Sequence, residues 1–374
     1  MTKRKILFII NKFKLGGAEM MVAAQANLIS RRNYETMVIS LYPNQSETNL
    51  AKRLSPAVEY HELGFKSLWD FDGWFRLYRL IKARQFAVVI TNLFDADVIG
   101  RITAIIARIP IIITYEHSQY PDKHRWQIWL DRFLAPFTDK IIVGSTQVKD
   151  FTMKQEKLPG DKFLVNYNSL ELEFDDDRGQ RDQVLAEFGL PTDCLYLVTA
   201  GRLVEQKGHR YLLKAIKQLK TENRLGKVKV LIFGEGVLAS EFKQYLDEHN
   251  LHNEVKFYPP ADMHQILAMA DIFVLPSLWE GLSLALVSAM NAGCSILGTK
   301  ISGTLDAIQD GENGVLVPSG DSDSLAEAIV SLTADSEKRA RLGRMAAITS
   351  QNFSIEKNVD RIIGLIDSLW SKVG

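Results

Sequence analysis

The sequence has only two cysteines, Cys194 and Cys294, which lie a hundred residues apart. This spacing excludes a disulfide framework and a cysteine-based metal site, and it suits a reducing compartment. No apolar run approaches the roughly 18 residues of a membrane-spanning helix, and the first run, 6–10, is too short for the core of a signal peptide. We therefore expect a soluble, cytoplasmic protein.

The sequence also lacks net charge, because 45 Lys and Arg balance 45 Asp and Glu. The balance hides an asymmetry. Residues 1–168 hold 24 basic and 16 acidic side chains, a charge of +8, whereas residues 169–374 hold 21 and 29, a charge of −8. A basic half favours an anionic partner, such as a membrane surface or an acidic acceptor, although plain solvation explains these charges equally well. No nucleic-acid-binding motif accompanies them, so no nucleic acid partner is expected.

The chain does contain enough apolar residues for two domains, since 374 residues at 46% hydrophobic exceed the size at which one core usually divides. Short apolar runs alternate with helical patterns, which indicates α/β domains with parallel sheets. A polar, acidic stretch at 171–182 is typical of a linker. We expect a first domain at 1–168, a linker at 169–194 and a second domain at 195–354. An amphipathic helix at about 355–374 is expected to pack back on the first domain.

Two predicted helices interleave aromatic and basic residues, one at 69–84 and one at 125–133. Exposed, they would be interfacial membrane helices, with aromatic rings at headgroup depth and cations on anionic lipid. Alternatively, the aromatic residues belong to the core of ordinary amphipathic helices. The core alternative is favoured for the first stretch, and the two alternatives stand equal for the second.

Signals of a site concentrate at 272–293, where a buried strand, a loop and a helix follow one another. The loop carries Glu280, and the helix is expected to begin near Leu282 and to end at Gly293. Ligands of open α/β sheets bind at the carboxyl ends of strands, where the first amides of a helix also face anions. Glu280 and these amides are therefore candidate ligand groups, although a glutamate at this place can simply cap the helix.

A second candidate is the loop after the strand 195–199. Its cations, Arg202 and Lys207, could converge on a diphosphate, and each charge-assisted hydrogen bond would contribute roughly 1.5–3 kcal/mol. The alternative is a pair of surface cations. Asp95 and Asp97 mimic an Asp-x-Asp metal motif, but they precede a predicted helix and are expected to cap it.

Together these motifs closely resemble a family 4 glycosyltransferase of the GT-B fold, over essentially the whole chain. The motifs are Gly16-Gly-Ala-Glu19, Tyr-Glu-His117-Ser, Gly201-Arg-Leu with Lys207-Gly208, Gly234-Glu-Gly236 and Pro276-Ser-Leu-Trp-Glu-Gly-Leu-Ser-Leu284. The resemblance implies two Rossmann-like domains with parallel sheets facing across a cleft. It implies a nucleotide-sugar in the second domain and a glycan or lipid-linked acceptor mainly in the first. Transfer would retain the anomeric configuration without metal or cofactor, in polysaccharide synthesis. The basic first half of the chain suggests association with the inner face of the membrane.

The resemblance also implies roles for single residues. Arg202 and Lys207 would stabilise the leaving diphosphate, Glu280 would hold hydroxyls of the donor sugar, and His117 would lie near the reacting carbon, unless it is a structural histidine. The implied donor-binding residues are Gly16, Gly17, Gly201, Gly234, Gly281, Leu282, Ser283, Leu284 and Ser288.

The sequence departs from the family pattern at Ser288, where relatives place a second glutamate that grips the ribose. A hydroxyl cannot replace the bidentate acceptor of a carboxylate. The family pattern at the domain junction is also altered, to Asn168-Ser-Leu-Glu171. A UDP-sugar is the expected donor on family frequency. Two alternatives stay open: a nucleotide-sugar epimerase of similar fold, and an inactive homologue that binds nucleotide or carbohydrate.

Overall fold

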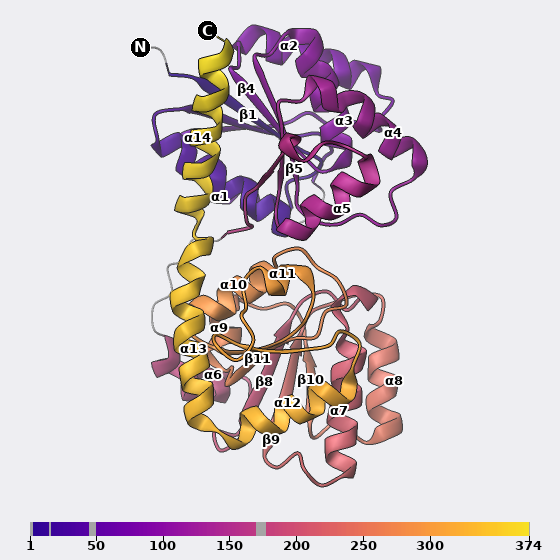
Figure 1. The fold of residues 1–374 in the computed structure, drawn as a ribbon, viewed down its shortest axis with the longest axis vertical. Coiled ribbons are helices and arrows are strands. Elements are labelled where there is room, and N and C mark those ends of the chain that lie inside the picture. Colours follow the sequence, from indigo (N-terminus) through magenta and orange to yellow (C-terminus); the bar gives the residue numbers. More distant parts are fainter. Residues whose placement is uncertain (1–2, 15, 45–49, 170–176, 374) are drawn as a thin grey trace. The chain divides into compact units, whose positions relative to one another are not determined.

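A computed structural model describes residues 3–14, 16–44, 50–169 and 177–373. Most of the acidic linker stretch, 170–176 with Glu171 of the altered junction motif, lies outside the described residues. The chain divides into two compact units (Figure 1). Unit 1 comprises Met1–Glu171 and Ser354–Gly374, and unit 2 comprises Leu172–Phe353.

Unit 1 is built on a parallel sheet of seven strands in the order β3-β2-β1-β4-β5-β6-β7. The strands are β1 (Lys5–Ile10), β2 (Glu35–Ser40), β3 (Val58–Glu62), β4 (Val88–Asn92), β5 (Ile111–Glu116), β6 (Lys140–Val143) and β7 (Phe163–Val165). The central strands β1, β4 and β5 are almost entirely buried. Their continuous apolar runs are therefore covered by helices on both faces, as expected for a parallel sheet.

The helices of unit 1 include the last helix of the chain. They are α1 (Gly17–Arg31), α2 (Phe71–Arg84), α3 (Phe94–Ala107), α4 (Arg125–Leu134), α5 (Thr146–Glu156) and α14 (Ile355–Val373), with 3₁₀ turns η1 (Leu50–Arg53), η2 (Ala135–Phe137) and η3 (Gly160–Lys162). α14 packs against α1, and Gln25 Nε2 donates to Asn358 Oδ1 across this buried contact at 2.9 Å. The Asn358 amide also donates to the Tyr167 carbonyl at 2.8 Å, which ties α14 to the end of β7.

Unit 2 contains a parallel sheet of six strands in the order β10-β9-β8-β11-β12-β13. The strands are β8 (Leu195–Ala200), β9 (Val228–Phe233), β10 (Val255–Tyr258), β11 (Ile272–Leu275), β12 (Ser295–Thr299) and β13 (Val315–Val317). The helices are α6 (Arg181–Glu187), α7 (His209–Thr221), α8 (Ala239–His249), α9 (Met263–Ala268), α10 (Leu284–Asn291), α11 (Ser302–Leu305), α12 (Ser322–Ala334) and α13 (Ser336–Ser350), with 3₁₀ turns η4 (Asp177–Gln180), η5 (Glu205–Lys207) and η6 (Gln351–Phe353).

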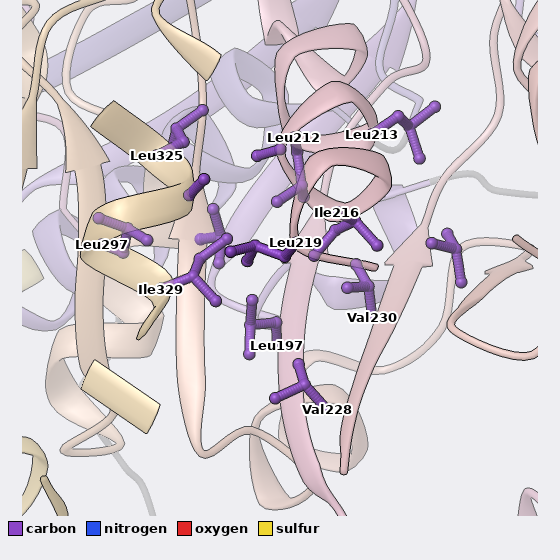
Figure 2. Close-up of a cluster of buried hydrophobic side chains, with 14 of the residues drawn as sticks. Leu197, Leu212, Leu213, Ile216, Leu219, Val228, Val230, Leu297, Leu325 and Ile329 are labelled. Carbon is purple, nitrogen blue, oxygen red and sulfur yellow. The ribbon is translucent and has the colours of Figure 1, made fainter. Parts of the chain in front are cut away.

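The core of unit 2 lies between the sheet and the helices α7 and α12. Figure 2 shows leucine and isoleucine side chains from α7, α12 and the strands meeting there, among them Leu212, Leu219 and Ile329. In α7 the buried residues recur at Leu212, Ile216 and Leu219, the spacing of one helix face. This packing holds α7, and with it the loop before α7, against the strand ends.

The parallel sheets expected from the apolar runs are confirmed, with differences at the edges. Strands β3 and β7 were not predicted. β3 buries only Val58 and carries two glutamates, and β7 is three residues long, so neither has the apolar run of a central strand. Helix α1 begins at Gly17, and its N-cap Gly16 is in extended conformation.

The two aromatic helices agree with the core alternative only in part, since Trp74 and Tyr78 of α2 pack against the hydrophobic core of unit 1. In α2, Leu77 and Ile81 fill the buried face, whereas Trp69, Phe71 and Phe75 are exposed. The core prediction favoured for this stretch is therefore wrong for these three rings. In α4 the aromatic residues also point outward, as described below. Within the described residues, no helix has both the length and the apolar character needed to cross a bilayer.

The prediction that Asp95 and Asp97 cap a helix is wrong. The N-cap of α3 is Leu93, and both acids lie within the first turn. Tyr42 donates to Asp95 Oδ2 at 2.7 Å, and Thr91 donates to buried Asp97 at 2.5 Å. Burial raises the pKa of Asp97 to about 7, since the charge of Arg101 and the hydroxyl bonds compensate only part of the lost hydration.

A buried group of ions fixes the segment between β5 and α4. The Lys123 ammonium lies 3.2 Å from Glu116, 2.8 Å from Asp131 and 2.9 Å from Glu156. Arg101 pairs with Asp131 at 2.5 Å. These three carboxylates have the spacing of a cation site, and the Lys123 ammonium lies within ion-pair distance of all of them. Burial alone would lower the pKa of Lys123, but the three acids together raise it.

Removal of this cation should be strongly destabilising. In Lys123→Met, the buried carboxylates lose their shared partner, so the free energy of unfolding should fall by about 3–5 kcal/mol. Urea denaturation measures this change. Lys227→Met is the matched control, because Lys227 pairs with Asp193 at 2.5 Å but is 74% exposed, and the stability of this variant should stay at the wild-type value. Equal effects of the two substitutions would contradict the argument.

Candidate functional site

The carboxyl edge of the unit 2 sheet collects most of the predicted site residues. The loop after β8 carries Gly201, Arg202 and Lys207, the loop after β9 carries Gly234, and the loop after β11 carries Glu280. Because β8 lies between β9 and β11 in the sheet, these three loops emerge side by side. The structure therefore brings the cations and the acid of the two sequence motifs to one place.

The central contact of this edge is an ion pair between Lys207 and Glu280. The Lys207 Nζ atom lies 2.5 Å from Glu280 Oε1, and both side chains are largely buried, at 14% and 7% exposure. Ser277 Oγ donates to the same oxygen at 2.5 Å. Neither bond uses Oε2. Glu280 therefore does not cap α10, whose N-cap is Ser283, and the capping alternative is wrong.

The loop of Glu280 is also held through its backbone. Ser302 Oγ donates to the Glu280 carbonyl at 2.7 Å, and the Gly303 amide donates to it at 3.3 Å. On the other side, Gln206 Nε2 donates to the Trp279 carbonyl at 3.0 Å, and Arg202 donates to Gln206 Oε1 at 3.3 Å. Arg202 is thereby connected to the Glu280 loop through a single glutamine.

Glycines allow the backbones of these loops to pack directly against one another. A Cβ atom on Gly234 would lie under 3.0 Å from the carbonyl of Gly201, and one on Gly208 would meet the carbonyl of Pro276 in the same way. Gly208 also has φ +63°, a conformation that favours glycine. A Cβ atom on Gly303 would collide with the carbonyl of Gly281. Gly234 and Gly208 are therefore required for close packing, whether or not they also approach a ligand, whereas a Cβ atom on Gly201 would meet only the side chain of Lys207.

The other predicted donor-binding residues of unit 2 lie on helix α10 or directly before it. Leu284 is its first residue, and Leu282 and Ser283 precede it, so the first-turn amides open at the same edge as Glu280. Ser288, in the second turn, is 6% exposed. Four residues separate Leu284 from Ser288, which places both on one side of the helix.

Sequence reasoning missed Ser277, Ser302, Gly303 and Gln206 as members of this edge. Ser277 lies inside a quoted motif, and Gln206 lies directly before Lys207, between the two parts of another. Ser302 and Gly303 follow β12, a fourth strand end, and a polar glycine-containing loop at that place was the available signal.

Gly16, Gly17 and His117 lie in unit 1. Gly16 precedes α1, and the carboxylate of Glu19 folds back against it, so that a side chain at Gly16 would collide with Glu19 Oε2. Burial raises the pKa of Glu19. The first turn of α1 thus begins beside an acid that has lost much of its contact with water.

His117 follows β5 and is 6% exposed. Its ring stacks on Tyr115, and its Nε2 atom lies 2.9 Å from Asn92 Oδ1, which can only accept, so the proton is assigned to Nε2. Burial lowers its pKa to about 4, while an interaction with Asn168 acts in the opposite direction. His117 is therefore neutral at pH 7 and does not supply a positive charge.

The chain matches the sequence patterns of two known protein families. The pattern of the family described as Glycosyltransferase Family 4 matches residues 15–174, and that described as Glycosyl transferases group 1 matches residues 180–349. The chain belongs to glycosyltransferase family 4. The two matches correspond closely to units 1 and 2. The family and the enzyme class expected from the motifs are thus confirmed.

Similar proteins span most of the chain. A UDP-Gal:alpha-D-GlcNAc-diphosphoundecaprenol alpha-1,3-galactosyltransferase of Escherichia coli is 28% identical over 313 residues, 81% of each chain. The crystal structure of Anabaena HepE in complex with UDP-glucose has a TM-score of 0.83 at 23% identity and covers 97% of this chain and 99% of its own. A glycosyltransferase from Rickettsia africae reaches 0.85 at 16% identity, with 99% of both chains covered. The family 4 chain therefore has the GT-B fold.

The clash at Gly303 gives a test of the edge. Gly303→Ala should push the Gly281 backbone away and displace the Glu280 loop, lowering transferase turnover at least about tenfold, since small misplacements at a site are costly. Gly364→Ala is the matched control, because a Cβ atom there meets nothing within 4 Å. Steady-state assays of both variants measure the difference, and a fully active Gly303→Ala enzyme would contradict the packing argument.

Burial of His117 predicts a pH dependence of stability. The folded pKa of about 4 lies below the ordinary value of 6.5, so the contribution is complete above pH 6.5 and is lost as the pH falls toward 4. The difference in unfolding free energy between wild type and His117→Gln should therefore grow by roughly 3 kcal/mol from pH 4 to pH 6.5. Urea titrations at several pH values measure it. A difference that does not change with pH would show that the histidine is not kept neutral by burial.

Proposed function

We propose that this family 4 enzyme is a retaining, metal-independent transferase that moves a sugar from a UDP-sugar to a lipid-linked or glycan acceptor in polysaccharide synthesis. The observation that carries the proposal is the Lys207–Glu280 pair at the edge of the unit 2 sheet, beside Arg202 and the first turn of α10. This edge offers two cations and a carboxylate, as a nucleotide diphosphate attached to a sugar requires.

The electrostatics of the edge suit departure of a diphosphate. Negative charge develops on the leaving group during transfer, and Lys207 and Arg202, positioned before the reaction begins, stabilise it. The amides of Leu282, Ser283 and Leu284 at the start of α10 add donors. Lys207 is paired with a single carboxylate, so its remaining N–H groups are available to phosphate oxygens.

Glu280 is proposed to bind the sugar. Its Oε1 atom accepts from Lys207 and Ser277, so Oε2 is the oxygen proposed to accept from a sugar hydroxyl. The remaining assignments are also part of the proposal. His117 lies near the reacting carbon, Gly16 and Gly17 offer amides to the donor, and Ser288 faces the ribose with a hydroxyl instead of a carboxylate.

The named relatives support the choice of substrates. The Escherichia coli relative carries a UDP-galactose donor and a diphosphoundecaprenol acceptor in its name, and HepE was solved with UDP-glucose. Other relatives are named for lipopolysaccharide core biosynthesis in Rhizobium meliloti and as the putative glycosyltransferase EpsF in Bacillus subtilis. Action at the inner face of the membrane, with contact between the basic first unit and anionic lipid, belongs to the same proposal.

Nucleotide choice is tested first by thermal shift. UDP and UDP-sugars should raise the melting temperature more than GDP, ADP and their sugars, because a ligand that binds only the folded state stabilises it. Turnover of the preferred donor with a lipid-linked acceptor should then proceed in EDTA and give a product of retained configuration by NMR. Isomerised donor without acceptor would indicate an epimerase instead, and binding without turnover or hydrolysis would indicate an inactive homologue.

Lys207→Ala and Glu280→Ala should each lower turnover at least about a hundredfold, because loss of one preorganised group raises the barrier by on the order of 3–4 kcal/mol. Lys217→Ala is the matched control, since Lys217 is exposed on α7, the helix that follows the loop of Lys207. Initial rates at saturating donor measure the effect. Near-normal rates in either site variant would remove the proposed role of that residue.

A further inference from the structure

The outer face of α4, as we name it, consists of exposed aromatic and basic residues. Its members are Arg125, Trp126, Trp129, Arg132, Phe133 and, from the adjoining turn η2, Phe137. Their spacing places them on one side of a helical stretch. The four rings are 49% to 61% exposed, which is unusual for large apolar side chains in a well-packed domain.

The inward side of α4 explains this orientation. Asp131 is the only acid between Arg125 and Phe137, and it is turned inward to pair with Arg101 at 2.5 Å and Lys123 at 2.8 Å. Rotating α4 to bury its aromatic residues would carry Asp131 into solvent and leave two buried cations without this partner. The buried ion pairs therefore keep the rings on the outside.

The rings form a continuous ridge. Trp129 stacks on Phe133 with centroids 5.5 Å apart, and Phe133 lies 6.4 Å from Phe137. At the other end, the edge of Trp126 packs on Phe94 of α3 at 5.4 Å. Arg125 and Arg132 are exposed on the same helix, so the face presents apolar rings and positive charge together.

We propose that the outer face of α4 binds the surface of an anionic lipid bilayer. Tryptophan and phenylalanine enter the headgroup region, and arginine pairs with lipid phosphates while its stem lies along the apolar boundary. The face carries no acid, and the half of the chain that contains it has a charge of +8. Both features complement anionic lipid.

A second copy of the chain fits this face poorly. In a twofold contact, the same patch meets itself, so Arg125 and Arg132 of one copy would approach those of the other with no acid between them.

The inference rests on the proposed function in one respect: binding to the bilayer would bring the enzyme to its lipid-linked acceptor. Its test needs no substrate, so a failure of lipid binding can be told apart from a failure of sugar transfer.

Vesicle sedimentation tests the proposal. Vesicles of phosphatidylcholine alone are compared with vesicles that contain phosphatidylglycerol. Wild type should sediment with the anionic vesicles, and the Trp129→Ser, Phe133→Ser double variant should partition at least about tenfold less. Ile348→Ser, which removes an equally exposed apolar side chain from α13 in unit 2, should bind like wild type. Arg125→Gln with Arg132→Gln should weaken binding and reduce its sensitivity to salt.

Several outcomes would overturn the proposal. They are absence of wild-type binding to anionic vesicles, undiminished binding by the double variant, and a dimer by light scattering that the double variant abolishes. The last result would assign the face to a protein contact. Thermal melting checks the fold of each variant. Hydrolysis of the UDP-sugar without vesicles should be unchanged by the α4 substitutions. Wild type that binds anionic vesicles but neither binds nor turns over a nucleotide-sugar would count against the proposed function alone.

Discussion

Backbone-to-backbone contact between loops is the constraint on which the candidate site depends. Gly234 lies directly against Gly201, and Gly208 lies against Pro276, so three loops from neighbouring strands form one connected edge. A side chain at Gly234 or Gly208 would separate the loops and the charged groups that they carry. Because the loops are fixed by contact rather than by long side chains, the ion pair of Lys207 with its carboxylate is already formed in the protein alone.

Two lysines show how the surroundings of the same group decide its role. Lys123 is buried among three carboxylates and lies within ion-pair distance of all of them, so it serves to hold α4 and the segment before it. Lys207 has one carboxylate partner and remains partly exposed at the end of a strand. The three partners of Lys123 make it a structural residue. Lys207, with one carboxylate partner, can still donate hydrogen bonds to an anion that binds at the site.

Much of the fold and part of the site could be predicted from the sequence because they depend on local patterns. Continuous apolar runs gave the central strands, and glycines and charges after those runs gave Arg202, Lys207 and Glu280. What depends on contacts distant in sequence could not be predicted. Ser302 reaches the Glu280 carbonyl from another strand end, and β3 is held mainly by its neighbour. The sequence also left open which face of α4 is buried. Periodicity shows that the helix has two faces, but it does not show which one meets a buried partner such as Arg101.

The anchoring of α4 has a kinetic and an evolutionary consequence. Many membrane-binding helices fold only on contact with lipid and lose affinity to the entropy of that ordering. Here the buried ion pairs of Asp131 maintain the helix before any encounter, so adsorption requires no coupled folding. The exposed side chains contribute little to the core, and they lie on a different unit from the ion pair of the candidate site. Selection can therefore adjust how long the enzyme stays on a membrane, through residues such as Trp129, without disturbing either the fold or the chemistry.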